Sequence, residues 1–193
     1  MALISSLTRC LENLRTAFSL GADRAILLKT DKETDSVLQP IHCSNLISQF
    51  ITKNNIDVVL LGKQAIDDDY NQTGQMIGGL LGWPFVTNIA KLDYNENEGK
   101  FNARREIDGG TQEVKTGKNS VFTCDLRLNK PRLPKLTDIM KAKKKTIEIQ
   151  EVDEEIFGQL KAVEVLSFEQ PVNKKNCQML KDVDELASVL NRL

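Results

Sequence analysis

Apolar residues recur along the chain at two spacings, one typical of amphipathic helices and the other of buried strands. Helical spacing runs from Leu7 to Phe18, from Ser44 to Ile51 and from Met76 to Leu81. Short apolar runs suited to strands lie at 25–28, 56–61, 85–92, 100–107 and 121–124. Because helices and strands alternate over the first half of the chain, the pattern predicts parallel strands joined by crossover helices.

The strongest strand signal is the run Val58-Val59-Leu60-Leu61, which predicts a strand buried on both faces and ends at Gly62. Asn71-Gln72-Thr73 precedes an expected helix at Gly74–Leu81, whose N-terminus would offer N–H groups to a phosphate. Neither the GxGxxG nor the GxxxxGK[ST] pattern is present. Spacing alone therefore leaves a nucleotide site and an ordinary strand, loop and helix equally open.

Composition excludes several classes of function. The chain has 193 residues, with 26 Lys and Arg against 27 Asp and Glu, so no basic surplus points to nucleic acid. Its four cysteines lack CxxC spacing, which favours reduced thiols over a metal site or a disulfide framework. No apolar run approaches the length of a membrane span. The single histidine, His42, excludes catalysis by a histidine pair.

The residues after the aliphatic run carry a more specific signal. Leu-Leu-Gly-Lys-Gln-Ala-Ile-Asp-Asp-Asp-Tyr-Asn-Gln-Thr-Gly-Gln, at 60–75, resembles the signature of the electron transfer flavoprotein beta subunit family. The resemblance implies a structural AMP, with Asn71, Gln72 and Thr73 on the phosphate side. The AMP site that it implies consists of Gly62, Lys63, Gln64, Ala65, Ile66, Asp67, Asp68, Asp69, Tyr70, Asn71, Gln72 and Thr73.

The resemblance also implies a fold and two domains. We expect a doubly wound, mostly parallel α/β sheet of the adenine-nucleotide-binding type over residues 1–150. Since the match begins near Cys10, we expect this sheet to lack the family's usual first strands. Residues 151–193 are expected to form an extended arm that ends in an amphipathic helix and wraps the alpha subunit.

Two further stretches match the family. In 104–110, the resemblance implies that Glu106 faces the mobile flavin domain of the alpha subunit in an exchangeable charge pair. Pattern alone favours a solvated strand residue, since exposed pairs contribute at most about 1 kcal/mol. In 129–145, the resemblance implies a loop that captures partner dehydrogenases through Leu136, with Lys141 and Lys144 as candidates for methylation. Pattern alone favours a loop and a solvated basic helix.

The family's activity gives the leading functional hypothesis, a non-enzymatic electron-carrier subunit in the mitochondrial matrix. FAD, held mainly by the alpha subunit, would take electrons from acyl-CoA dehydrogenases of fatty acid beta-oxidation. It would pass them to electron transfer flavoprotein-ubiquinone oxidoreductase in the respiratory chain. Two alternatives stay open, a nucleotide-dependent enzyme that binds Mg²⁺ through 67–69 and a non-functional truncated isoform.

Overall fold

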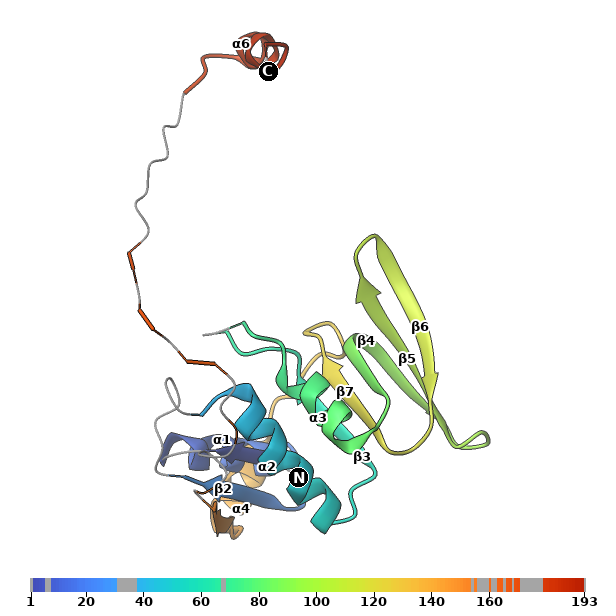
Figure 1. Ribbon diagram of the computed structural model, residues 1–193. Coiled ribbons are helices and arrows are strands. Elements are labelled where there is room, and N and C mark those ends of the chain that lie inside the picture. The colour runs from blue at the N-terminus through green and yellow to red at the C-terminus, as the bar shows by residue number, and fades with distance from the viewer. Residues whose placement is uncertain are drawn as a thin grey trace. The chain divides into compact units, whose positions relative to one another are not determined.

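The computed structural model describes residues 2–5, 8–30, 38–66, 69–153, 155, 160, 163–164, 166–167, 169–170 and 179–192 (Figure 1). The chain divides into two compact units, Met1–Val163 and Glu164–Leu193. The first unit holds both β-sheets and all the described residues of the predicted AMP and docking sites. In the second unit, α6 (Val183–Leu190) is capped by Asp182, whose side chain accepts a hydrogen bond of 2.8 Å from the Glu185 N–H.

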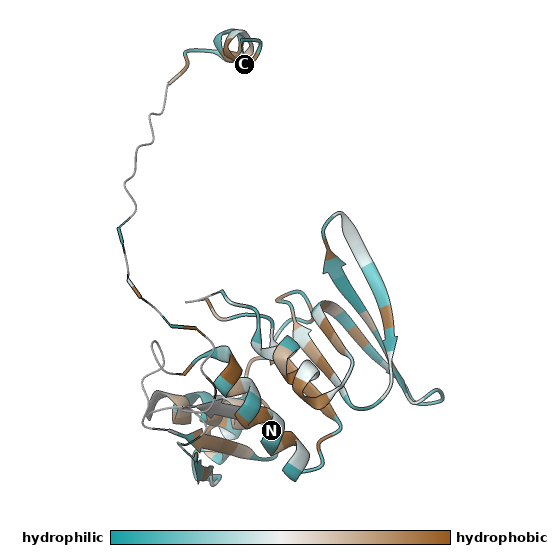
Figure 2. Ribbon diagram, in the orientation of Figure 1, coloured by the Kyte–Doolittle hydropathy of each residue, from teal (hydrophilic) through white to brown (hydrophobic). Residues whose placement is uncertain are grey.

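One sheet is fully parallel and has the strand order β1-β2-β8. Its strands are β1 (Ala2–Ser5), β2 (Ala25–Lys29) and β8 (Glu148–Glu151). The helix α1 (Thr8–Ser19) connects β1 to β2 and packs with α4 (Leu136–Lys144) around Leu14, Phe18 and Ala142. On the alternate positions of β2, Ile26 and Leu28 pack against α2 (Pro40–Lys53). Figure 2 shows β2 as predominantly hydrophobic, as a strand with buried residues on both faces requires.

The other sheet has five strands in the order β3-β7-β4-β5-β6. Its strands are β3 (Val58–Gly62), β4 (Phe85–Asn95), β5 (Lys100–Ile107), β6 (Gly110–Thr116) and β7 (Ser120–Cys124). The first three strands in this order are parallel, whereas β4, β5 and β6 form antiparallel pairs. The β5 and β6 strands are mostly hydrophilic (Figure 2).

The helix α3 (Thr73–Leu81) lies on this second sheet at a distance that only glycine permits. A Cβ at Gly74 would lie 2.3 Å from Thr123 Cγ2, and one at Gly78 would lie 2.8 Å from Phe85 Cδ1. The two glycines are four residues apart and so share one helix face. Their close approach buries Ile77 with Val59 and Val121 and fixes the start of α3 beside the ends of β3 and β7.

The helices and strands that periodicity predicted are confirmed, with differences at particular positions. The expected mostly parallel α/β architecture is confirmed, whereas the expected single sheet is wrong for the described residues, since β2 and β3 belong to separate sheets. The structure also places a short strand, β1, before α1, where the sequence predicted none. The aliphatic run is not buried on both faces, because Leu60 is 57% exposed while Val59 is buried. The reason is that Val59 faces Ile77 of α3, whereas Leu60, the next residue along the strand, points to the opposite face of the sheet.

Candidate functional site

The site predicted from the sequence lies at the carboxyl ends of two neighbouring parallel strands. The register that pairs Val58 with Ser120 continues to Gly62 and Cys124, so Lys63 and Asp125 leave the sheet at the same edge. The Lys63 N–H donates to the Cys124 carbonyl over 3.2 Å. In open parallel sheets this edge is where ligands bind.

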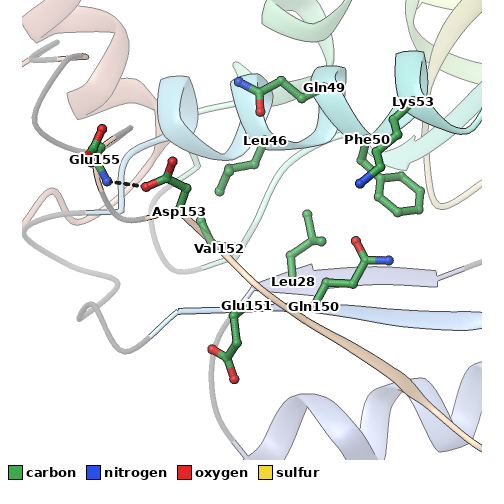
Figure 3. Close-up of a pocket in the computed structure, with 10 residues that line it drawn as sticks. All are labelled: Leu28, Leu46, Gln49, Phe50, Lys53, Gln150, Glu151, Val152, Asp153 and Glu155. Carbon is green, nitrogen blue, oxygen red and sulfur yellow. Dashed lines mark hydrogen bonds between the residues drawn. The ribbon is translucent and has the colours of Figure 1, made fainter.

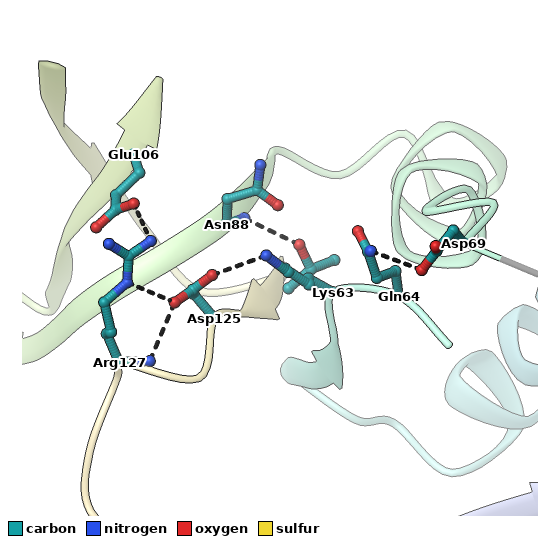
Figure 4. Close-up of polar contacts among 8 residues, drawn as sticks. Lys63, Gln64, Asp69, Asn88, Glu106, Asp125 and Arg127 are labelled. Carbon is teal, nitrogen blue, oxygen red and sulfur yellow. Dashed lines mark hydrogen bonds and ion pairs between the residues drawn. The ribbon is translucent and has the colours of Figure 1, made fainter. Parts of the chain in front are cut away.

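A chain of charged side chains crosses this edge (Figure 4). The Lys63 ammonium contacts Asp125 Oδ2 at 2.9 Å, and Arg127 Nε donates to Asp125 Oδ1 over 3.0 Å. The backbone N–H of Arg127 donates to the same oxygen, also over 3.0 Å. A terminal nitrogen of Arg127 then donates to Glu106 Oε2. The predicted AMP loop is thereby connected to the predicted docking residue Glu106 through Asp125 and Arg127.

These contacts explain the protonation states at the edge. The hydrogen bond from Lys63, followed by those from Arg127, holds the pKa of the Asp125 carboxyl well below its usual range. The hydrogen bond to Asp125 in turn raises the pKa of Arg127. Asp125 therefore stays a carboxylate at neutral pH, which the burial of its side chain, only 5% exposed, would otherwise oppose. Burial raises the pKa of the neighbouring Cys124 thiol, so that this sulfur is protonated and a poor nucleophile at neutral pH.

Asn88 lies beside this cluster on β4 (Figure 4). The register of β4 on β7 shifts between Val86 and Ile89, and Asn88 adopts a left-handed φ of 57° there. Its N–H donates to Thr123 Oγ1 over 3.1 Å, which holds the irregularity in place. Its Oδ1 is buried without a hydrogen-bond partner. Strained backbone and unsatisfied polar atoms concentrate at functional sites, which adds to the case for this edge.

Most of the described side chains in the loop after β3 are exposed. Gly62 has no atom within 4 Å of an added Cβ, which leaves space for a ligand against the backbone. Gln64 Nε2 donates to Asp69 Oδ1 over 2.8 Å, and the Asp69 N–H donates to the Ala65 carbonyl over 3.2 Å, so the loop closes on itself. Ala65, Ile66 and Tyr70 are exposed. Asp67 and Asp68 lie outside the described residues.

The last residues of the loop lead into α3. Asn71 has a left-handed φ of 48°, and its Oδ1 accepts a hydrogen bond of 3.0 Å from Gln75 Nε2. Gln72 is the N-cap residue of α3, and Thr73 is the first helical residue. The Thr73 carbonyl accepts a hydrogen bond of 3.1 Å from Ser44 Oγ, which ties the start of α3 to α2. The predicted phosphate-side residues thus lie at a helix N-terminus, as expected from the sequence.

The predicted docking segment is fixed at its base and exposed at its apolar residues. Leu136 is 74% exposed at the start of α4. A terminal nitrogen of Arg132 donates to the Leu20 carbonyl, and Arg15 donates to the Ala142 carbonyl over 2.8 Å. Ala142 itself is buried against α1. Lys141 and Lys144, the candidates for methylation, are both exposed.

Sequence reasoning missed Asp125 and Arg127. The signal available was a pair of opposite charges, Asp125-Leu126-Arg127, directly after a short apolar strand. Pairing of that strand with β3 brings this carboxylate to Lys63, and no local pattern predicts such a pairing.

Among the described residues no group of three or more His, Cys, Asp or Glu side chains is suited to hold a metal ion. The Asp69 carboxylate accepts a hydrogen bond from Gln64.

A separate pocket of about 270 Å³ lies between α2 and β8, away from the residues predicted from the sequence (Figure 3). Leu46 and Phe50 from α2 face Leu28 from β2 across the pocket, and Lys53 and Glu151 also line it. Nothing in the described chain forms a helix with both the length and the apolar character needed to cross a bilayer.

Comparison with known proteins gives a consistent result. The family model described as "Electron transfer flavoprotein domain" matches residues 4–155. The chain is 38% identical over 183 residues to "Electron transfer flavoprotein subunit beta, mitochondrial" of Arabidopsis thaliana, which covers 95% of this chain and 71% of that relative. The beta subunit of Bradyrhizobium diazoefficiens is 40% identical over 93% of this chain and 70% of its own length. The beta subunit of Mus musculus is 37% identical over 96% of this chain and 72% of its own length.

Proposed function

This chain belongs to the electron transfer flavoprotein beta subunit family, and from that premise we propose that it binds a structural AMP and docks dehydrogenases for a flavin-bearing alpha subunit. It carries out no bond-making chemistry itself. FAD, held mainly by the alpha subunit, supplies the redox chemistry. The observation that carries the proposal is the loop at 62–73, most of whose described residues are exposed and which joins the carboxyl end of β3 to the N-terminus of α3.

Three features of this loop support an adenylate. The first N–H groups of α3 have no partners within the helix and carry a partial positive charge, which suits a phosphate. Gly62 leaves the backbone open to close approach. The Lys63 ammonium is already held by Asp125, so phosphate contacts fall to α3 and its approach, the residues Asn71, Gln72 and Thr73. Carboxylates near a phosphate repel it, and the Asp69 carboxylate is held by Gln64, whose Nε2 donates to its Oδ1 over 2.8 Å.

Docking of dehydrogenases is supported by the form of the segment 129–145. Ile139 and Met140 follow Leu136 by three and four residues, so the three side chains form one exposed apolar surface on α4. Lys141, Lys143 and Lys144 follow in the last turn. An apolar anchor beside a basic rim suits an acidic partner. Methylation of Lys141 or Lys144 would keep the charge while enlarging the head group.

The remaining parts of the proposal concern the assembly. Residues 151–193, with the exposed apolar side chains Leu186 and Leu190 on α6, wrap the alpha subunit. Glu106 meets the mobile flavin domain, whose movement gates electron transfer. Electrons pass from acyl-CoA dehydrogenases to electron transfer flavoprotein-ubiquinone oxidoreductase, and the compartment is the mitochondrial matrix.

The direct test is to co-express this chain with an alpha subunit and to identify the bound small molecules by mass spectrometry. We expect one AMP and one FAD per heterodimer. Exchange of Thr73 for Val and of Asn71 for Leu should lower the AMP content without removing FAD. A purified heterodimer that contains FAD and no adenylate, or one that folds equally well without it, would contradict the AMP site.

A further inference from the structure

The position of Arg127 gives Glu106 a partner within its own chain. Glu106 is on β5, and a terminal nitrogen of Arg127 donates to its Oε2 (Figure 4). The proposed function requires that Glu106 pair with a cation of the alpha subunit. Arg127 occupies one oxygen of this carboxylate and places its positive charge where a cation of the alpha subunit would approach.

Arg127 is held at one end and exposed at the other. Its Nε and its backbone N–H both donate to Asp125 Oδ1, each over 3.0 Å. Asp125 is buried and has a second cation, Lys63, on its other oxygen at 2.9 Å. The Arg127 side chain is nevertheless 65% exposed, and that of Glu106 is 32% exposed. An incoming cation therefore reaches Glu106 without breaking the contact between Arg127 and Asp125.

We propose that Arg127 is a positioning residue that competes, within this chain, for the carboxylate of Glu106. Asp125 keeps the guanidinium beside Glu106, where it occupies Oε2 and repels the alpha subunit's cation. This inference rests on the proposed function. The internal pair lowers the population of the flavin-domain orientation that engages Glu106, and so keeps the domain free to move between its donor and its acceptor.

The energy scale suits such an exchange. Exposed ion pairs contribute little, and their median lies between about 0 and 1 kcal/mol, a factor of up to about 5 in an equilibrium. A partner held that weakly is replaced readily, whereas a fully buried pair would not be. Lys63 and Arg127 both remain bound to Asp125. The exchange therefore affects only the contact between Arg127 and Glu106.

The test uses the heterodimer with its flavin. A donor dye at Glu96, in the exposed turn after β4, and an acceptor on the partner's flavin domain report the orientation by single-molecule energy transfer. Arg127→Gln should raise the ratio of the Glu106-engaged orientation to the others about 2- to 5-fold at low salt. The increase should vanish near 0.5 M salt, where the screening length is about 4 Å. A purely structural effect would not respond to salt in this way.

Two controls isolate the pair. Arg104→Gln removes a cation from the same face of β5, two residues away, and should leave the ratio unchanged if the effect is specific. Arg127→Gln should have no effect in a Glu106→Gln background. Arg127→Lys retains the charge without the planar fork and should stay on the buried Asp125, so it should release Glu106 as Arg127→Gln does.

The outcomes separate the inference from the proposed function. A heterodimer that contains AMP and FAD, yet shows the same orientation ratio with and without Arg127, would overturn the competition and leave the function intact. An equal rise with Arg104→Gln would overturn it as well, because the effect would then be one of net charge. Failure to recover any flavin-bearing partner would overturn both.

Discussion

Lys63 and Asp125 form an ion pair of 2.9 Å between the residues that follow two adjacent parallel strands. The pair closes the carboxyl edge of β3 and β7 at the point where the proposed adenylate loop begins. Since Asp125 also holds Arg127, one buried carboxylate organises both the loop and the surroundings of Glu106.

The lowered pKa of Asp125 predicts a pH dependence of stability. A carboxyl with a depressed pKa in the folded state stabilises the fold above its unfolded pKa, and this contribution is lost as the pH falls. The free energy of unfolding should therefore decrease as the pH is lowered below about 4, the ordinary pKa of Asp. Denaturant titrations between pH 7 and pH 3 measure the effect.

Asp125→Asn should lower stability at pH 7 by about 1–3 kcal/mol, because it removes hydrogen bonds to a charged group. It should also flatten the decrease in acid. Asp93→Asn is the matched control, since Asp93 pairs with Lys91 at 2.9 Å and both side chains are more than half exposed. That change should stay within about 0.5 kcal/mol. Equal effects of the two substitutions would contradict the role given to Asp125.

The two adjacent glycines of α3 should respond in opposite directions to alanine. Gly78→Ala places a Cβ 2.8 Å from Phe85 Cδ1 and should destabilise the protein by about 1–3 kcal/mol. Gly79→Ala meets no atom within 4 Å and should stabilise it by about 0.5–1 kcal/mol through helix propensity. Thermal unfolding of both variants decides. A stabilised Gly78→Ala variant would mean that α3 lies farther from the sheet than its close approach to Phe85 requires.

His42 should contribute to stability through both ring nitrogens. Its Nδ1 accepts from the Gln39 N–H over 3.0 Å, and its Nε2 lies 2.6 Å from the Leu160 carbonyl. His42→Ala removes the bond from the N-cap residue Gln39 to His42, which is half of the capping box of α2, together with the contact to residue 160, and should cost about 1–2 kcal/mol in chemical unfolding. Gln49→Ala, which changes an exposed residue of the same helix, should cost much less. Similar losses from both would indicate that the His42 contacts contribute little.

Contacts between residues that are close in the sequence could be predicted, whereas contacts between residues far apart in the sequence could not. The apolar spacing predicted α1, α2, α3 and most strands, because that spacing reflects neighbours within one element. The pair of Lys63 and Asp125 joins residues that are 62 positions apart, and the irregularity at Asn88 depends on Thr123 from another strand. The division into two sheets likewise depends on which strands pair. Such contacts leave no periodic trace, so the sequence predicted the loop and not the charges that hold it.

The capping of α4 illustrates the same limit at short range. Asp138 is a good capping residue followed by a basic segment, which suggests a helix that starts after it. In the structure the helix starts earlier, with Lys135 as the N-cap residue and Asp138 in the first turn. Asp138 there still favours the helix through its dipole. The earlier start also places Leu136 on the helix, one turn before Met140. Leu136 therefore belongs to the same exposed apolar surface as Ile139 and Met140.

Leu136→Ala should separate docking from folding. The side chain is 74% exposed, so its removal should leave the melting temperature and the AMP and FAD content unchanged. If Leu136 is the anchor of a docking surface, the rate of electron transfer from an acyl-CoA dehydrogenase at limiting concentration should fall tenfold or more, since interface anchors cost about 2 kcal/mol or more when truncated. Leu133→Ala, an exposed leucine before the helix, is the control and should have a much smaller effect. Equal electron-transfer rates for the Leu136 variant and the unchanged protein would place the docking surface elsewhere on the chain.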